Sequence, residues 1–142
     1  MQKWMVLILV VLGLVSPLKA YAAPLKLTLT EGVIQPIPYA APVFVAENRA
    51  AEDWSKKITA LVVQDLNSSG LFREVSKAKY ISQITSFASP VQYSDWKAIN
   101  GRALGTGAVK ISSKEQLGVK FRSYDVFAGQ ELGDGLQFVG TK

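Results

Sequence analysis

Residues 103–126 read ALGTGAVKISSKEQLGVKFRSYDV, and this stretch decides the fold. On both sides of Ser113-Lys114-Glu115 the pattern has a period of two, which is typical of half-buried strands joined in a hairpin. In the second strand, one face carries Leu117, Val119 and Phe121, and the opposite face carries Lys120, Arg122 and Tyr124. A strand pair with two different faces predicts a sheet that packs against other elements.

Four further strands are expected around this hairpin. Apolar and polar residues alternate over Leu25–Thr30, residues 40–46 are almost continuously apolar, and Phe72–Ser76 follows a glycine. After a turn at Ala128-Gly129, residues 130–141 form another strand, and the Gly133-Asp134-Gly135 motif within it indicates a bulge or a second tight turn.

Three prolines interrupt the apolar stretch TEGVIQPIPYAAPVFV, residues 30–45. Since proline cannot donate to a sheet ladder, Pro36 and Pro38 belong in an extended connection or at the beginning of a strand. Pro42 removes a donor inside the strand predicted at 40–46, which indicates an edge or a bulge there.

The clearest helix lies between Asn48, its predicted cap, and Gly70, which closes it. Glu52 and Asp53 fall in its positive first turns. Its apolar stripe consists of Trp54, Ile58, Leu61, Val62 and Leu66.

Two shorter helical pieces complete the prediction: a turn at Tyr80–Ile84, and a helix in SDWKAING that begins at Ser94 as cap, with Asp95 in its first turn, and ends at Gly101. Trp54 and Trp96 are expected in the core. The expected fold is α/β of the α+β kind, a mixed sheet with two to three helices packed mainly on one face.

Residues 1–22 have the features of a signal peptide: Lys3 supplies a positive charge, Trp4–Val15 is apolar, and Ala20-Tyr21-Ala22 precedes cleavage before Ala23. An uncleaved anchor is the alternative, but it needs roughly 20 apolar residues. The expected product has 120 residues, enough for one domain. Without Lys3 and Lys19 it carries 14 basic and 11 acidic residues, a net charge of +3.

Few residues in this chain are suited to catalysis. With no histidine and no cysteine, it has neither a His-based triad nor nitrogen and sulfur ligands for zinc, and it forms no disulfide. The acidic residues Asp125, Glu131 and Asp134 surround a predicted turn. Residues 101–107 contain G-x-G before a strand, so small residues that allow close packing are the better explanation than a phosphate site. We expect no catalytic residue, cofactor or metal.

Several motifs in combination resemble the amino-terminal domain of the TolB family. They are TEG followed by PIP, the helix exit DLNSSGLF, the helix DWKAIN and the turn YDVFAGQ, and the resemblance covers nearly all of residues 23–142.

The resemblance implies a periplasmic binding module of the Tol-Pal envelope system. In that family the first mature residues bind the C-terminal domain of TolA, and a following β-propeller binds Pal. The corresponding residues here are Ala23, Pro24, Leu25, Lys26, Leu27, Thr28, Leu29, Thr30, Glu31 and Gly32. An extended strand can add to a partner's sheet edge, with Glu31-Gly32 as the joint. The alternative from the residues alone is an ordinary internal edge strand.

Family members continue with a further helix and the propeller, so we expect no Pal binding, and part of the sheet's apolar face uncovered. The sequence is therefore interpreted as a truncated product or, alternatively, a stand-alone domain. Two other functions are open: an envelope regulator similar to LpoB or CsgG-type proteins, and a nucleic-acid module, which the weak charge disfavours.

Overall fold

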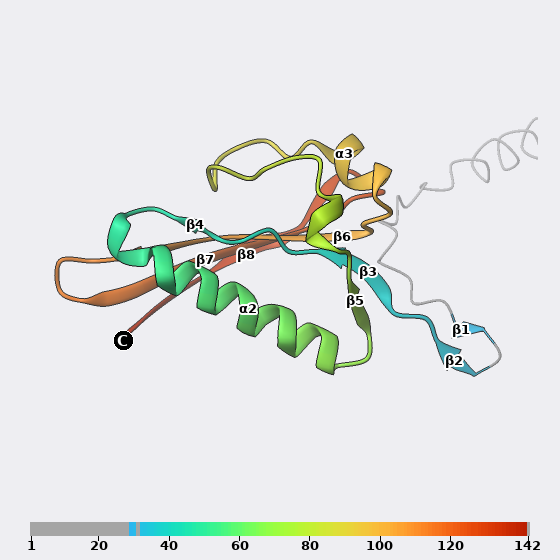
Figure 1. Ribbon diagram of the computed structural model, residues 1–142, viewed down its shortest axis with the longest axis horizontal. Helices are drawn as coiled ribbons and strands as arrows, with labels where there is room; N and C mark the ends of the chain where they lie inside the picture. Colours follow the sequence, from blue (N-terminus) through green and yellow to red (C-terminus); the bar gives the residue numbers. More distant parts are fainter. Residues whose placement is uncertain (1–28, 31, 142) are drawn as a thin grey trace, which may run out of the picture.

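The computed structural model describes residues 29, 30 and 32–141. The predicted signal peptide and its cleavage site at Ala20, Ala22 and Ala23 lie outside these residues, as do residues 25–28 of the first expected strand. Figure 1 shows the arrangement of the described elements.

A six-stranded mixed sheet forms the centre of the molecule, with the order β5-β3-β6-β7-β8 and with β4 paired to β6. The strands of this sheet are β3 (Ile37–Ala40), β4 (Val45–Ala46), β5 (Phe72–Glu74), β6 (Ala103–Ile111), β7 (Gln116–Asp125) and β8 (Gln130–Thr141). Strands β3, β4 and β5 pair parallel with their neighbours, whereas β6, β7 and β8 pair antiparallel with one another. This mixed sheet confirms the predicted α+β class.

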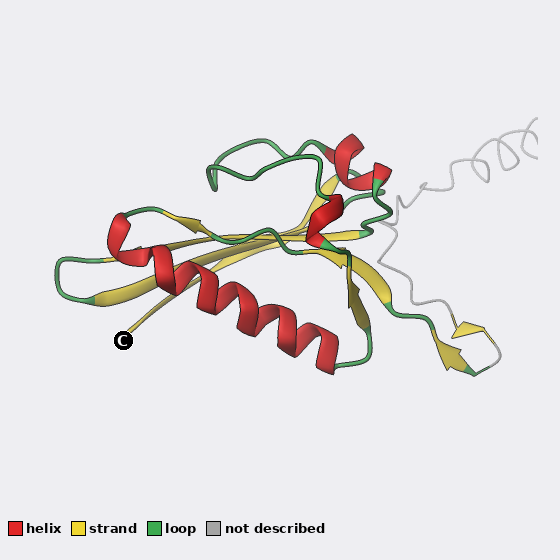
Figure 2. Cartoon of the chain, viewed as in Figure 1, coloured by secondary structure: helices red, strands yellow, loops and turns green. Residues whose placement is uncertain are grey.

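Helices lie on both faces of the sheet (Figures 1 and 2). The long helix α2 (Glu52–Ser68), preceded by the 3-10 turn η1 (Arg49–Ala51), covers one face. The short helix α3 (Tyr93–Ala98) and the segment with the 3-10 turn η2 (Lys77–Lys79) lie on the other. Each face has its own core. Phe44, Ala51, Val109 and Ile111 are buried under α2, and Ala40, Trp96, Leu104, Tyr124 and Val126 are buried on the α3 face.

The predicted hairpin of residues 103–126 is confirmed. Strands β6 and β7 pair from Ala103 opposite Asp125 to Ile111 opposite Leu117, with their turn at residues 112–115. The expected strand at 130–141 is also present as β8. Gly133 and Gly135 have φ angles of 73° and 74°, and the β7–β8 register shifts between Phe121 and Ser123. The glycine motif therefore forms a bulge rather than a second turn.

The continuous strand predicted at residues 40–46 is wrong. The chain leaves β3 after Ala40 and returns to the same neighbour as β4 at Val45. Ala40 pairs with Leu104 and Val45 with Ala108, so five residue steps on one side match four on β6, and the extra residue makes a bulge. Pro42 lies in this bulge, between β3 and β4. Of the edge and the bulge that its missing donor indicated, the structure has the bulge.

Pro38 lies within β3, near its beginning, as predicted. Its carbonyl accepts a hydrogen bond from the Arg102 N–H at 2.8 Å, and the β3–β6 register begins one residue later, at Tyr39 opposite Ala103. The donor that proline lacks would therefore lie ahead of the ladder, where no ladder bond is lost.

Side chains accept hydrogen bonds from backbone N–H groups within residues 41–44, the segment between β3 and β4. The Phe44 N–H donates to Thr59 Oγ1 at 2.9 Å, and the Thr59 hydroxyl donates to the Ser55 carbonyl at 2.7 Å. On the opposite face, the Ala41 N–H donates to the Tyr80 hydroxyl at 2.9 Å. Because a buried N–H without a partner is costly, these bonds explain how the chain can leave the sheet inside the protein.

The same bonds correct the predicted orientation of the long helix. Its fully buried residues are Ser55 and Thr59, whereas Trp54, Ile58, Val62 and Leu66 of the predicted stripe are half-buried. Leu61 is 57% exposed. The helix thus turns Ser55 and Thr59 toward the bulge, and Trp54, Ile58 and Val62 of the predicted stripe pack against the edge of the core beside them.

Helix ends were predicted with mixed success. Gly70, with φ 73°, follows the helix as expected, and Glu52 and Asp53 lie in its first turn. Asn48 is not a side-chain cap. Its Nδ2 donates to the Ile111 carbonyl at 2.7 Å and its Oδ1 accepts from the Ile111 N–H at 3.3 Å. This pair of bonds ties the start of the helical region to the end of β6.

The two shorter helical predictions also need correction. The residue that caps α3 is Gln92 rather than Ser94, and the helix ends at Ala98. Asp95 lies in its first turn, as predicted, and accepts a hydrogen bond from the Ser82 hydroxyl. The turn predicted at Tyr80–Ile84 lies earlier, as η2, because Tyr80 is extended and directs its ring against Trp96, 5.1 Å between centroids.

Gly107 lets the Phe44 ring lie directly on β6. A Cβ at this position would be 2.5 Å from Phe44 Cδ2, so the prediction of small residues for close packing holds for an aromatic ring rather than for a helix. We expect Gly107→Ala to lower the free energy of unfolding by about 1–3 kcal/mol, because the ring must move. Gly118→Ala, whose Cβ would meet its nearest atom at 3.7 Å, is the control and should be neutral or stabilise by up to about 1 kcal/mol. Urea unfolding compares the two variants, and equal losses would contradict this account of Gly107.

Candidate partner-binding surface

The described part of the predicted partner-binding segment forms a small hairpin. Strand β1 (Leu29–Thr30) pairs antiparallel with β2 (Val33–Ile34), with Leu29 opposite Ile34 and Thr30 opposite Val33. Gly32, with φ 77°, lies in the turn, where glycine adopts this angle without steric cost. Positions 23–28 and 31 of the predicted segment lie outside the described residues.

This hairpin stands apart from the main sheet. Strands β1 and β2 form a two-stranded sheet of their own, and Figure 1 shows them outside the main sheet, next to the beginning of β3. Val33 is 65% exposed and Ile34 is 44% exposed. A joint was expected at Glu31-Gly32, but the pairing of Val33–Ile34 back onto Leu29–Thr30 was not predicted. The adjacent apolar pair directly after a glycine was the available signal.

A second candidate surface is an apolar groove between α2 and the sheet. A groove of about 500 Å³ is lined by Phe44, Ile58, Val62, Leu66, Val119, Phe121 and Phe138. Phe138, which lies on β8, is 59% exposed. The groove follows from the orientation of α2. Ser55 and Thr59 point at the bulge, so Ile58, Val62 and Leu66 form one wall of the groove, above β7 and β8.

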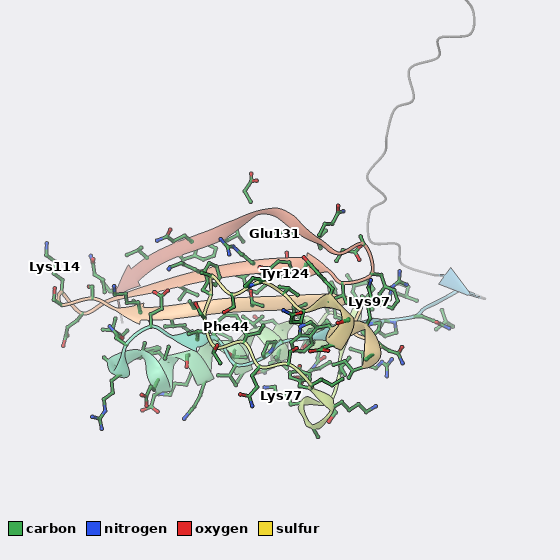
Figure 3. All side chains as sticks on the ribbon, turned by 90° about the horizontal axis from the view of Figure 1, so that it is seen from above. Phe44, Lys77, Lys97, Lys114, Tyr124 and Glu131 are labelled. Atoms are coloured by element: carbon green, nitrogen blue, oxygen red, sulfur yellow. The ribbon has the colours of Figure 1, made fainter. Side chains whose placement is uncertain are left out.

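The charged groups do not form one patch. Figure 3 shows Lys77, Lys97 and Lys114 in separate places, in agreement with the scattered charges seen in the sequence. On the α3 face, two cations already have acidic partners. Lys120 Nζ lies 2.8 Å from Glu47 Oε1, and Arg122 Nε lies 3.3 Å from Glu131 Oε1.

The acidic residues near the last turn have local structural roles. Asp125 Oδ1 accepts from the Ala128 N–H and the Asp125 carbonyl accepts from the Gly129 N–H, both at 2.9 Å. Within the described residues, no three acidic side chains gather where they could hold a metal ion. The turn role predicted for Asp125 is thus confirmed.

Burial is the main cause of a raised pKa at three tyrosines, Tyr39, Tyr80 and Tyr93. Burial raises the pKa of Tyr39 to about 12, and Glu74 and Tyr80 add to the shift. Its hydroxyl donates to the Val63 carbonyl on α2 at 3.2 Å. A phenol that keeps its proton at neutral pH is a structural donor, which here joins β3 to the helix.

None of the helices in the described residues has the length and apolar character needed to cross a membrane.

Comparison with known proteins gives the family of this fold. The sequence profile described as the TolB amino-terminal domain matches residues 25–132. The chain belongs to the TolB amino-terminal domain family. The resemblance found in the motifs is thereby confirmed.

The curated relatives within this family are longer proteins. The Tol-Pal system protein TolB of Roseobacter denitrificans is 53% identical over 120 residues, which make up 84% of this chain and 27% of that protein. The Tol-Pal system protein TolB of Dinoroseobacter shibae is 50% identical over 136 residues, 94% of this chain and 30% of that protein. The chain therefore spans less than a third of the length of these TolB proteins.

Solved structures agree on the fold. TolB from Acinetobacter baumannii has a TM-score of 0.52 and 28% identity, covering 74% of this chain and 23% of that one. The LpoB C-terminal domain from Escherichia coli has a TM-score of 0.57, covering 80% and 88%, but only 10% identity. The likeness to LpoB therefore shows a shared fold and no more.

Proposed function

We propose that this chain is a protein-binding module of the Tol-Pal envelope system in the periplasm, and that Ala23–Gly32 binds the C-terminal domain of TolA by strand addition. Through this contact it contributes to outer-membrane integrity and to constriction at cell division. It acts by binding and not by catalysis. We expect no binding of Pal, nucleic acid or small-molecule substrate by this domain.

The observation that carries the proposal is the separate β1–β2 hairpin. Its strands belong to no larger sheet in the described part of the chain, so their outer backbone groups are open to a partner strand. Adding a strand to a partner's sheet edge satisfies such groups with main-chain hydrogen bonds, and alternate side chains supply specificity. Leu25, Leu27 and Leu29 provide that alternation in the sequence.

The connection to the domain supports the same mode of binding. Gln35-Pro36 joins β2 to β3, and Pro38 lies at the second position of β3. Proline restricts its own φ and that of the preceding residue, so the hairpin leaves the sheet in a limited range of directions. A pre-ordered connection lowers the entropy lost on binding.

Calorimetry with the TolA C-terminal domain tests this function. A chain that begins at residue 23 should bind, and one that begins at residue 33 should bind at least about a hundredfold more weakly, because the added strand supplies the main-chain contacts. Both should unfold at the same temperature, since β1 and β2 pair only with each other in the described residues. Equal heats from the two proteins would show that the site is elsewhere.

A matched pair of substitutions tests the alternation. In an extended strand, Leu27 and Thr28 point to opposite faces. We expect Leu27→Asp to weaken TolA binding at least about tenfold, and Thr28→Asp to weaken it less, because only the leucine face enters apolar surroundings. Binding of a penicillin-binding protein in place of TolA would support the alternative, an envelope regulator similar to LpoB.

A further inference from the structure

The short helix α3 ends in a tight backbone turn formed by Asn100 and Gly101. The Asn100 N–H donates to the Lys97 carbonyl at 2.9 Å, and the Gly101 N–H donates to the Trp96 carbonyl at 3.0 Å. Asn100 has a φ angle of 59°, in the left-handed region, which asparagine adopts more readily than most other residues with a side chain. Two such hydrogen bonds around a left-handed residue form the Schellman motif, which satisfies the last carbonyls of a helix.

The dipeptide that forms this turn is also chemically reactive, and Asn-Gly occurs once in the chain. The nitrogen that follows an asparagine can attack the side-chain amide, and glycine hinders this attack least because it has no Cβ. The Gly101 nitrogen bonds to Asn100 Cγ, the Cγ–Nδ2 bond breaks, and Nδ2 leaves as ammonia with the proton of the Gly101 N–H. Water then opens the resulting succinimide ring and leaves aspartate or isoaspartate.

The folded structure protects the attacking nitrogen. A peptide nitrogen becomes a nucleophile only when base removes its proton, the same step that starts amide hydrogen exchange. Here that proton is held by the Trp96 carbonyl, and Gly101 is buried. A Cβ at Gly101 would lie 3.3 Å from the Trp96 carbonyl oxygen and 3.9 Å from Ala40 Cβ, so the backbone is closely packed. Asn100 itself is exposed, so the turn, and not a lack of water, prevents the reaction.

Contacts on both sides hold this turn closed. Before it, the Trp96 side chain is fully buried in the core of the α3 face. After it, the Arg102 N–H donates to the Pro38 carbonyl at 2.8 Å. Helix α3 has only six residues, and a helix this short depends on its tertiary contacts. The turn therefore opens when α3 lifts Trp96 out of the core, a smaller event than unfolding of the whole sheet.

We propose that Asn100-Gly101 is a deamidation site that is closed while α3 is folded and reacts when α3 opens. Isoaspartate carries the main chain through Cβ and so lengthens the backbone at Asn100. The two hydrogen bonds of the motif then no longer match the spacing of the chain, and α3 cannot close as before. A transient opening thereby becomes a permanent loosening of the core around Trp96. The site is separate from Ala23–Gly32 and does not depend on the proposed function.

Mass spectrometry of the full chain measures the reaction directly. Trypsin cleaves after Lys97 and Arg102, so residues 98–102 are released as one peptide whose mass reports deamidation. At the same pH and temperature, we expect Asn100 to deamidate at least about tenfold faster in concentrated guanidinium than in buffer, because unfolding frees the attacking nitrogen. Asn67, which precedes a serine, is the internal control and should react more slowly than Asn100 in guanidinium.

A matched pair of variants separates opening of α3 from unfolding of the whole domain. Trp96→Phe weakens the core on the α3 face, and Phe44→Leu weakens the core under α2. In buffer, we expect Trp96→Phe to raise the rate at Asn100 at least about fivefold, and Phe44→Leu to raise it less than about twofold. In guanidinium all three proteins should react at the same rate, because neither substitution touches the reacting atoms. Circular dichroism verifies that both variants are folded in buffer.

Hydrogen exchange after refolding tests the consequence of the reaction. Chains that carry isoaspartate and are returned to buffer should exchange the amides at the end of α3, residues 97–101, at least about tenfold faster than unmodified chains. The amides of α2 should keep their rates. The proposal is overturned if Asn100 reacts equally fast in buffer and in guanidinium, or if Phe44→Leu accelerates the reaction as much as Trp96→Phe. Unchanged exchange at the end of α3 in the refolded chains would also overturn it.

Discussion

Replacing Phe44 with alanine is expected to lower the free energy of unfolding by about 3–5 kcal/mol. Phe44 is only 3% exposed, and its ring lies against the backbone of Gly107 and 5.9 Å from the centroid of the Phe121 ring. It belongs to the core under α2 together with Val109 and Ile111. Removing the Phe44 ring loses this contact area and leaves a cavity over Gly107 in the core under α2.

Urea unfolding followed by circular dichroism measures this loss. Phe127→Ala is the matched control, because Phe127 is 51% exposed and its ring is 5.6 Å from the Arg102 guanidinium. Such an exposed contact is worth about 0.5–1 kcal/mol, so the control should remain within about 1 kcal/mol of the unsubstituted protein. If both variants lost the same stability, Phe44 would not be a core residue.

Trp96→Ala should have a loss of similar size, about 3–5 kcal/mol, on the opposite face of the sheet. The Trp96 side chain is fully buried among Ala40, Leu104 and Val126, and the Tyr80 ring packs edge-on against it. Tyr80 in turn accepts the Ala41 N–H. Loss of the indole therefore also removes the support for Tyr80, whose hydroxyl accepts the Ala41 N–H where the chain leaves β3.

Two comparisons separate packing from other causes. Trp96 Nε1 has no hydrogen-bond partner among the described residues, so we expect Trp96→Phe to sacrifice no hydrogen bond and to lower the stability clearly less than Trp96→Ala. Trp54→Ala, at a half-buried position on α2, should also cost less. Thermal unfolding of Trp96→Ala, Trp96→Phe and Trp54→Ala ranks the three variants by the stability that each loses. A Trp54→Ala loss equal to that of Trp96→Ala would contradict the burial that the structure assigns to the two indoles.

Local pattern predicted the antiparallel half of the sheet well. The β6–β7 hairpin and β8 lie where the period of two and the turn residues placed them, because adjacent strands need only local turns and a repeating face. The bulge at Gly133–Gly135 was one of the two alternatives that the glycines indicated, the other being a second tight turn. Trp96 was correctly assigned to the core by its place on a short amphipathic helix.

The same reasoning failed where a distant partner decides the conformation. Asn48 has the chemistry of a helix cap, yet it bonds to Ile111, which is 63 residues away. Ser55 and Thr59 had no predicted role, yet both are buried, and the Thr59 hydroxyl accepts the Phe44 N–H. The predicted apolar stripe does reach the core, through Trp54, Ile58 and Val62, but hydrophobicity alone missed the two fully buried residues, a polar pair at i and i+4.

The candidate site was predicted by resemblance more than by physical pattern. Alternating leucines at Leu25–Leu29 indicate a strand but do not say which sheet receives it. The structure adds that the described end of this segment pairs with Val33–Ile34 and not with the main sheet. Binding of TolA through Ala23–Gly32 stays a prediction.

Local pattern and composition were enough to predict the α+β class, the antiparallel hairpin, the position of the long helix and the absence of histidine and cysteine chemistry. These features depend on residues close together in the chain or on composition alone. Long-range contacts decided that Ser55 and Thr59 are the fully buried residues of α2, and how the chain leaves the sheet at Pro42. Each of those depends on a hydrogen bond or a ring contact between residues that the sequence separates widely.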